Sequence, residues 1–142
     1  MPHPVEASDD LQVRTLAEAL ALRDALLAYR DGAEVVSSTL ALGLGADEAL
    51  ARIRVGIDAV CPDAEVARVA AESILFLILG QVWHQQQRMQ ADSLGVVAPA
   101  VDTKPADAAA GVGLDGRGSL EFGIGLILDG LQKKLTLTHG SR

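Results

Sequence analysis

The residues best suited to chemistry stand at the end of the most apolar stretch of the chain. In LILGQVWHQQQ, residues 77–87, the single tryptophan, Trp83, is followed directly by His84. Histidine exchanges a proton near neutral pH, and tryptophan supplies a large apolar surface with one hydrogen-bond donor. Two interpretations are open. Either Trp83 packs on a partner helix while His84 hydrogen-bonds at the surface, or both side chains line the mouth of a ligand pocket.

Motifs for cofactors and metals are weak. GVGLDG, residues 111–116, has the glycine spacing of a dinucleotide-binding loop, but no strand precedes it, so we interpret it as part of a flexible lid or linker. His3, His84 and His139 lie far apart, and the spacings typical of zinc sites are absent. We therefore predict no metal site and no cofactor.

Nucleophilic catalysis also lacks a motif. Ser73, Cys61 and His84 are possible components, but the sequence contains no G-x-S-x-G elbow. Ser73 lies within a helical pattern, where a serine hydroxyl most often bonds to its own helix. The catalytic residue therefore stays unassigned, with His84 as the acid or base if the protein is an enzyme.

Composition and charge narrow the class of protein. The 142 residues fit one domain, and 49% hydrophobic residues with only 3% aromatic ones predict a helical core of Ala, Leu, Val and Ile. A net charge of -7 with three lysines argues against direct nucleic-acid binding. The start is polar, and the apolar stretch 74–83 spans about half of a membrane helix, which needs roughly 20 residues. With a single cysteine, these features predict a cytoplasmic domain outside the membrane.

Helical periodicity supplies the elements that position these residues. We predict helices over about 11–30, 33–42, 46–60, 63–90 and 119–137. Residues 1–9 are expected to be a disordered lead, 91–118 a mobile loop or lid, and 138–142 a tail. The stretch 73–79 is apolar on all sides, which indicates burial in a large core or, as we favour, at a subunit interface.

Three blocks carry a family resemblance: ALLAYRDGAEVV (25–36), SILFLILGQVWHQQQ (73–87) and LEFGIGLILDGLQKKL (120–135). Together they resemble the C-terminal core of the tetracycline-repressor (TetR) family. The resemblance implies that 10–137 is an all-α, single-domain helical bundle that binds a ligand and forms a homodimer. In the family, the long helix and the last helix of each subunit form a four-helix bundle.

The same resemblance bears on DNA binding. The family's helix-turn-helix lies N-terminal to this core, and only about ten residues precede the core here. We therefore expect that this chain does not itself bind DNA, and that it is either an excised domain or a natural stand-alone version.

The resemblance also implies site residues. Tetracycline repressors hold magnesium with a histidine at the position of Val36, and they place an acidic residue at His84 and a ligand-contacting histidine at Phe76. Apolar side chains at Val36 and Phe76 imply a largely apolar, metal-free metabolite. We also expect ligand contacts from residues that we judge to lie near these positions: Thr39, Leu40, Ile53, Ile78 and Trp83. For the dimer interface we predict Ile74, Leu77, Gly80, Gln81, Phe122 and Leu126.

Three functions follow from these features. The leading hypothesis is the small-molecule-sensing and dimerisation core of a transcriptional regulator. The alternative is a stand-alone binding or resistance protein, or an enzyme of secondary metabolism such as a cyclase or isomerase, which would act by orienting its substrate. A third is an antagonist that dimerises with a full-length relative.

Overall fold

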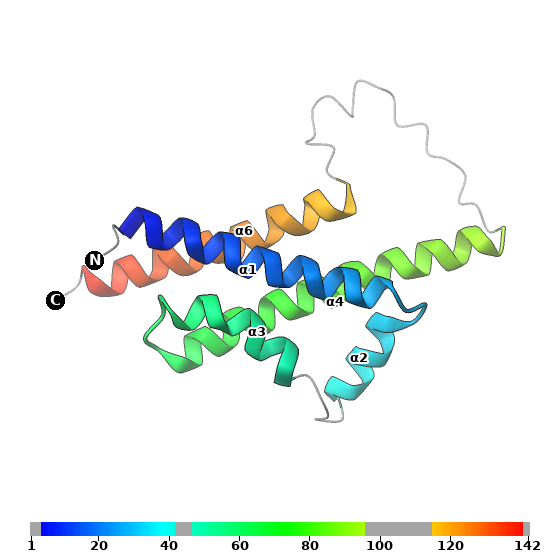
Figure 1. Ribbon diagram of the computed structural model, residues 1–142, viewed down its shortest axis with the longest axis horizontal. Helices are drawn as coiled ribbons and strands as arrows, with labels where there is room; N and C mark the ends of the chain where they lie inside the picture. The colour runs from blue at the N-terminus through cyan, green and yellow to red at the C-terminus, as the bar shows by residue number, and fades with distance from the viewer. Residues whose placement is uncertain (1–3, 42–46, 96–114, 141–142) are drawn as a thin grey trace, which may run out of the picture.

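The computed structural model describes residues 4–41, 47–95 and 115–140. These residues form the helices α1 (Pro4–Leu27), α2 (Gly32–Ala41), α3 (Asp47–Asp58), α4 (Ala64–Ser93) and α6 (Gly116–His139). No strand occurs in these ranges (Figure 1). The prediction of an all-α single domain is confirmed.

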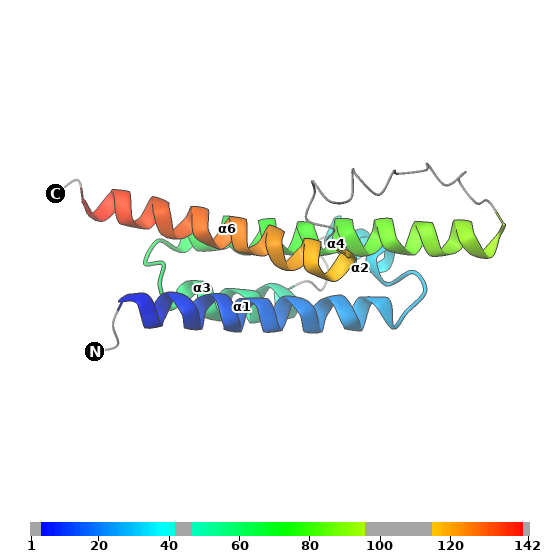
Figure 2. The ribbon, with the colours of Figure 1, turned by 90° about the horizontal axis from the view of Figure 1, so that it is seen from above.

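The helices form two layers, and α4 belongs to one of them. Figure 2 shows α1 and α3 in one layer and α4 with α6 in the other. α4 contacts α1, α2, α3 and α6, so the helix that carries the Trp-His sequence is also the centre of the fold. The short helix α2 leaves the end of α1 and packs on α4.

The core is aliphatic, as the composition predicts. On α4 the buried apolar residues are Ala67, Ala70, Ala71, Ile74, Leu75, Ile78, Leu79 and Val82. They meet buried residues of the neighbouring helices, among them Leu11, Leu26, Ile53, Ile57, Leu120, Ile124 and Leu128. Full burial of one such branched side chain contributes about 1.5–3 kcal/mol.

Side-chain caps and small residues position the helices. Asp63 caps α4 by accepting the N–H groups of Glu65 and Val66 at 3.0 and 3.1 Å. Where α4 meets α6, a Cβ added at Gly123 would lie 2.9 Å from Cδ2 of Leu77. The glycine therefore allows the two helices to approach closely.

One buried amide holds the corner between α1 and α2. Gln86 of α4 donates to the carbonyl oxygens of Leu26 at 3.2 Å and Tyr29 at 2.8 Å, and accepts the Ala33 N–H at 3.4 Å. Leu26 lies in the last turn of α1 and Tyr29 in the turn after it. Ala33 lies in the first turn of α2, where N–H groups lack partners within their own helix. A Cβ at Gly32 would collide with the carbonyl oxygen of Leu26, so the tight corner also needs a glycine.

Several predicted boundaries need correction. The helix α1 begins at Pro4, so residues 4–9 are helical and not a disordered lead. Proline suits a first helical turn because its missing N–H would have no partner there. Both ends of the loop predicted over 91–118 are helical, since α4 continues to Ser93 and α6 begins at Gly116, while 96–114 lie outside the described residues. The first two residues of the predicted tail, Thr138 and His139, are also in α6.

By length and composition, α4 is able to cross a membrane, and it is the one helix of the described ranges with this property. In the fold, 44% of its most apolar window is buried against other helices. A core helix of a water-soluble domain passes the same test, so this finding is weak evidence for a membrane span.

Candidate functional site

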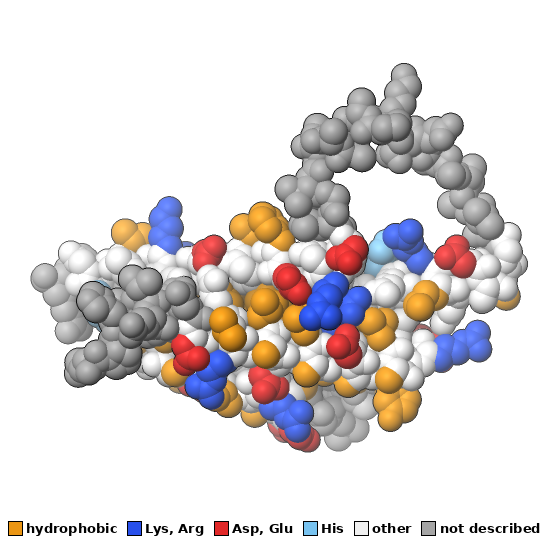
Figure 3. All heavy atoms as spheres, turned by 45° about the horizontal axis from the view of Figure 1, so that its top comes forward, with side chains coloured by type: hydrophobic (Ala, Val, Ile, Leu, Met, Phe, Trp, Pro, Cys, Tyr) orange, Lys and Arg blue, Asp and Glu red, His pale blue; other side chains and the backbone are white. Residues whose placement is uncertain are grey.

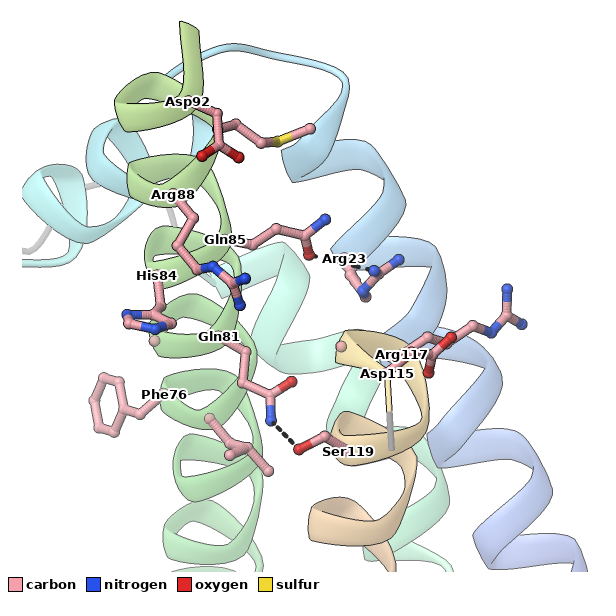
Figure 4. A pocket seen from close by; sticks show the side chains of 14 residues that line it. Arg23, Phe76, Gln81, His84, Gln85, Arg88, Asp92, Asp115, Arg117 and Ser119 are labelled. Carbon is pink, nitrogen blue, oxygen red and sulfur yellow. Dashed lines mark hydrogen bonds between the residues drawn. The ribbon is translucent and has the colours of Figure 1, made fainter. Parts of the chain in front are cut away.

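A groove of about 870 Å³ lies between α1, α4 and the first turn of α6 (Figure 4). We call it the α1/α4/α6 groove. One wall is a stripe of α4 at intervals of four residues, formed by Phe76, Gly80, His84 and Arg88. All four residues are exposed, and residues spaced by four share one side of a helix. The stripe therefore changes from apolar to charged along α4.

Polar contacts between helices hold the groove together. Nε2 of Gln81 donates to Oγ of Ser119 at 3.3 Å, which joins α4 to α6. Arg23 of α1 donates to Oε1 of Gln85 at 3.4 Å and to the carboxylate of Asp24 at 3.1 Å. In Figure 4 these side chains converge on the space between the three helices.

Charged side chains gather beside the groove. In Figure 3 a histidine lies next to a basic side chain, with acidic side chains nearby. Asp115, at the start of α6, accepts the N–H of Gly118 at 2.7 Å and so caps that helix. Arg117, in the first turn, pairs with Glu121 at 3.2 Å.

A second groove, of about 840 Å³, lies between α2 and α4, and we call it the α2/α4 groove. It shares Phe76 and Gly80 with the first groove but is otherwise lined by Glu34, Ser37, Ser38, Glu72, Leu79 and Trp83. Its charged groups are carboxylates, and that of Glu72 is paired with Arg68 at 2.7 Å.

Some expected ligand-binding residues line a groove. Phe76 and His84 lie on the wall of the α1/α4/α6 groove. Trp83 lines the α2/α4 groove instead, although it is adjacent to His84 in the sequence. Successive residues of a helix point about 100° apart, so the two side chains belong to different grooves. They do not form one pocket mouth.

The other expected ligand-binding residues lie elsewhere. Ile53 and Ile78 are fully buried in the core. Val36 packs against that core, and the hydroxyl of Thr39 bonds to two carbonyl oxygens of its own helix at 2.9 and 2.8 Å. The side chain of Leu40 lies outside the described residues. None of the four described residues lines either groove.

The expected interface residues are also divided. Phe122 and Leu126 of α6 are each 59% exposed, Gly80 is exposed, and Leu77 and Gln81 are half-buried. Ile74, by contrast, is completely buried within the chain and has no surface to offer a partner.

Six of the exposed apolar residues of α4 and α6 form what we call the α4/α6 face: Val66, Val69, Phe76, Trp83, Phe122 and Leu126. Glycines between them leave the backbone open. A Cβ added at Gly80, Gly125 or Gly130 would meet nothing within 4 Å. Such a surface lets another helix approach closely.

Sequence reasoning missed the arginines of the groove. A signal existed for Arg88, because it stands four residues after His84 on a stripe that becomes increasingly polar. No comparable signal existed for Arg23 or Arg117, which reach the groove from α1 and α6 through the tertiary fold.

The groove offers neither metal ligation nor an oriented catalytic base among the residues that the structure describes. No group of three or more His, Cys, Asp or Glu in these ranges is placed to hold a metal ion. The side chains of Val36 and Phe76 have no atom that binds magnesium, so the residues present do not fit the metal of the tetracycline repressors. His84 makes no hydrogen bond or ion pair with the described residues that would orient its ring as an acid or base.

The family model described as "Tetracyclin repressor-like, C-terminal domain" matches residues 3–135. No curated protein and no solved structure matches the chain.

Proposed function

We propose that this chain, which belongs to the family of tetracyclin repressor-like C-terminal domains, is the small-molecule-sensing and dimerisation core of a transcriptional regulator. C-terminal domains of the family generally bind ligands and dimerise. The core itself makes no contact with nucleic acid and acts in the cytoplasm. Its net charge of -7 is consistent with this division of roles.

The observation that carries the proposal is the α1/α4/α6 groove. Its volume of about 870 Å³ is within the range of small-molecule sites, and its walls combine apolar surface with a few polar groups. The ligand is a metabolite that carries no chelated metal and whose larger part is apolar, in contact with Phe76, Leu77 and Met89.

The α4/α6 face supports the dimerisation part of the proposal. Large apolar side chains that a single chain leaves exposed on two neighbouring helices are typical of a surface that a second copy covers. Because Phe76 and Gly80 belong to the groove as well as to this side of α4, a partner subunit would lie directly beside the bound ligand. Ligand binding would then favour one arrangement of the dimer over another.

Ligand binding is tested with an uncharged probe. Octan-1-ol is titrated into the isotopically labelled protein, and amide chemical shifts are followed by nuclear magnetic resonance. We expect the shifts to concentrate on residues that line the groove, such as Gly80 and Ser119. Shifts confined to α3, or no shifts at all, would contradict the assignment of the groove.

Dimerisation is tested with a matched pair of substitutions. Phe122→Asp places a charge on the α4/α6 face, where an unpaired charge in an interface is costly. Val13→Asp makes a similar change at an exposed residue of α1, which is 66% exposed. Sedimentation velocity should show a monomer for Phe122→Asp and a dimer for the wild type and for Val13→Asp. A dimer in all three would exclude the α4/α6 face as the interface.

A further inference from the structure

We propose that the ligand of the α1/α4/α6 groove is an amphipathic organic anion. Its carboxylate or similar head group binds at Arg88 and Arg23, and its apolar body lies along α4 toward Phe76. This inference rests on the proposed function, because it takes the groove to be the ligand site, and it adds the chemical class of the ligand.

The first observation is the state of the three arginines that line the groove. Arg117 is paired with Glu121 at 3.2 Å, and Arg23 is paired on one side with the exposed Asp24 at 3.1 Å. Arg88 forms no ion pair or hydrogen bond with the described residues, although it lines the groove. In a chain with a net charge of -7, an unpaired guanidinium beside a cavity indicates a site for an anion.

The acidic residues of the groove do not neutralise Arg88. The carboxylate of Asp115 is engaged as the cap of α6. Asp92 stands one turn after Arg88 but forms no ion pair with it. Figure 4 shows the guanidinium of Arg88 turned back along α4 toward His84 and Gln85, away from Asp92. The guanidinium is therefore directed into the groove.

The second observation is the low exposure of Arg23 beside this position. Its side chain is 14% exposed, and besides Asp24 it is held by the uncharged amide of Gln85 at 3.4 Å. Hydrogen bonds from a guanidinium to a carboxylate are stronger where less water competes. Gly116, at the N-terminal end of α6, lines the same part of the groove, and the positive end of a helix also favours an anion.

The third observation is the distance between the charged and the apolar ends. At a rise of 1.5 Å per residue, Gly80 lies about 12 Å and Phe76 about 18 Å from Arg88 along α4. Phe76, Leu77 and Gly80 present carbon surface at that end of the groove. A molecule bound here therefore needs a charged head at Arg88 and an apolar body that extends along α4 toward Gly80 and Phe76.

The α2/α4 groove would not accept the same ligand. It shares the apolar rim at Phe76 and Gly80, but its charged groups are the carboxylates of Glu34 and Glu72. The carboxylate of Glu34 repels an anionic head, whereas the charge of Glu72 is matched by Arg68. We therefore expect the two grooves to prefer head groups of opposite charge.

The test compares three probes with one alkyl chain: octanoate, octan-1-ol and octyltrimethylammonium. Binding to the whole chain is measured by isothermal titration calorimetry. We expect octanoate to bind at least about tenfold more tightly than octan-1-ol, because charge-assisted hydrogen bonds to guanidinium are strong. Equal affinity for octanoate and octan-1-ol overturns the inference and leaves the proposed function intact. No binding of any probe overturns both. A preference for octyltrimethylammonium overturns the inference in favour of the α2/α4 groove.

Arg88→Ala should abolish the preference for octanoate and leave the affinity for octan-1-ol unchanged. The matched control is Arg30→Ala, since Arg30 is an exposed arginine that does not line the groove. Arg30→Ala should retain the full preference, and thermal unfolding checks that both variants fold. A preference that survives in Arg88→Ala, or that Arg30→Ala removes equally, overturns the assignment of the head group to Arg88.

Discussion

The two grooves beside α4 share an apolar rim and differ in charge. Phe76 and Gly80 belong to the α1/α4/α6 groove and to the α2/α4 groove alike. Beyond this rim, the charged residues of the first groove are three arginines and two aspartates, and those of the second are two glutamates. Their volumes, about 870 and 840 Å³, do not distinguish them. Under the proposed function, the shared apolar surface of α4 contacts the body of a ligand, and the charges of the other lining residues select its head group.

The difference comes from the neighbouring helices as much as from α4. The helices α1 and α6 supply Arg23 and Arg117, whereas α2 supplies Glu34. Within the second groove, the charge of Glu72 is already matched by Arg68. Within the first, Arg88 has no such match among the described residues. The four predictions below test this comparison, beginning with the largest effect.

The structure of the α2/α4 groove should depend on the hydrogen bonds that Gln86 makes at the corner between α1 and α2. The structure of the α1/α4/α6 groove should depend on them less. Gln86→Leu leaves the buried Ala33 N–H without a partner, and the carbonyl groups of Leu26 and Tyr29 each keep only a backbone hydrogen bond. We therefore expect a loss of about 1–3 kcal/mol in the free energy of unfolding. Hydrogen exchange should accelerate in α2 more than in α6. Urea denaturation and exchange mass spectrometry measure the two effects.

The control for Gln86 is its neighbour. Gln85→Leu removes only the 3.4 Å contact with Arg23 and faces the other groove, so stability should change little. If Gln85→Leu were as destabilising as Gln86→Leu, or if α6 exchanged as fast as α2, the corner would not be specific to one groove.

The shared rim should contribute apolar contact without charge selection. Phe76→Ala should weaken the binding of octanoate and of octan-1-ol by the same factor, about fivefold, because it removes part of a carbon surface that is 60% exposed in the free chain. Calorimetry with the two probes checks this. A change in their affinity ratio would show that Phe76 also affects the head group.

A substitution at Gly80 tests whether the rim that the two grooves share is open. In Gly80→Ala the new methyl group meets nothing within 4 Å, so the gain in helix propensity should raise the free energy of unfolding by about 0.5–1 kcal/mol. The matched change is Gly56→Ala, whose Cβ would lie 2.7 Å from Oγ1 of the buried Thr15, and which should destabilise. Denaturation curves compare the two. A loss of stability in Gly80→Ala would show that the rim is closely covered.

The smallest effect concerns Arg68, which hydrogen-bonds to Glu65 and Glu72. Its hydrogen bond and charge lower the pKa of Glu65 below the ordinary 4.5. The stability that this pair contributes is therefore present above the unfolded pKa and is lost as pH falls through the folded pKa. In Arg68→Ala the pKa of Glu65 should rise toward 4.5, as measured by a nuclear magnetic resonance titration.

Arg68→Ala should also change ligand binding at the α2/α4 groove. Removing Arg68 leaves the charge of Glu72 unmatched, so octyltrimethylammonium should bind slightly more tightly while octanoate is unaffected. Arg52→Ala, which removes a comparable surface pair with Glu48, is the control and should change neither probe. An unchanged pKa of Glu65 in Arg68→Ala would contradict the attribution of the shift to Arg68.

Most of the fold was predictable and about half of the candidate site was not. Every described helix has its counterpart in the predicted ranges, because apolar periodicity and Gly or Pro breaks mark helices directly. The start of α1 at Pro4 was missed because polar first turns carry no periodic signal. Among the predicted ligand-binding residues, Phe76 and His84 line a groove, whereas Ile53 and Ile78 are buried in the core.

These different locations share a cause. Ile74, Phe76 and Ile78 are apolar residues of one helix, and the stretch 73–79 that contains them is apolar on every side. Which of them faces inward depends on where α1, α3 and α6 pack, and that is set by contacts such as Gly123 against Leu77. A helix without a polar face leaves its own orientation undetermined.

The sequence by itself determined that this protein is an all-α domain of a recognisable family, with a central helix too apolar to face water alone. These properties depend on local periodicity and on motifs whose residues are close together in the sequence. Only the tertiary structure decided that Trp83 and His84 line different grooves and that Arg23, Arg88 and Arg117 meet at one of them. The reason is geometric: the charge of a groove is the sum over side chains from several helices, and their distances in space are not distances in sequence.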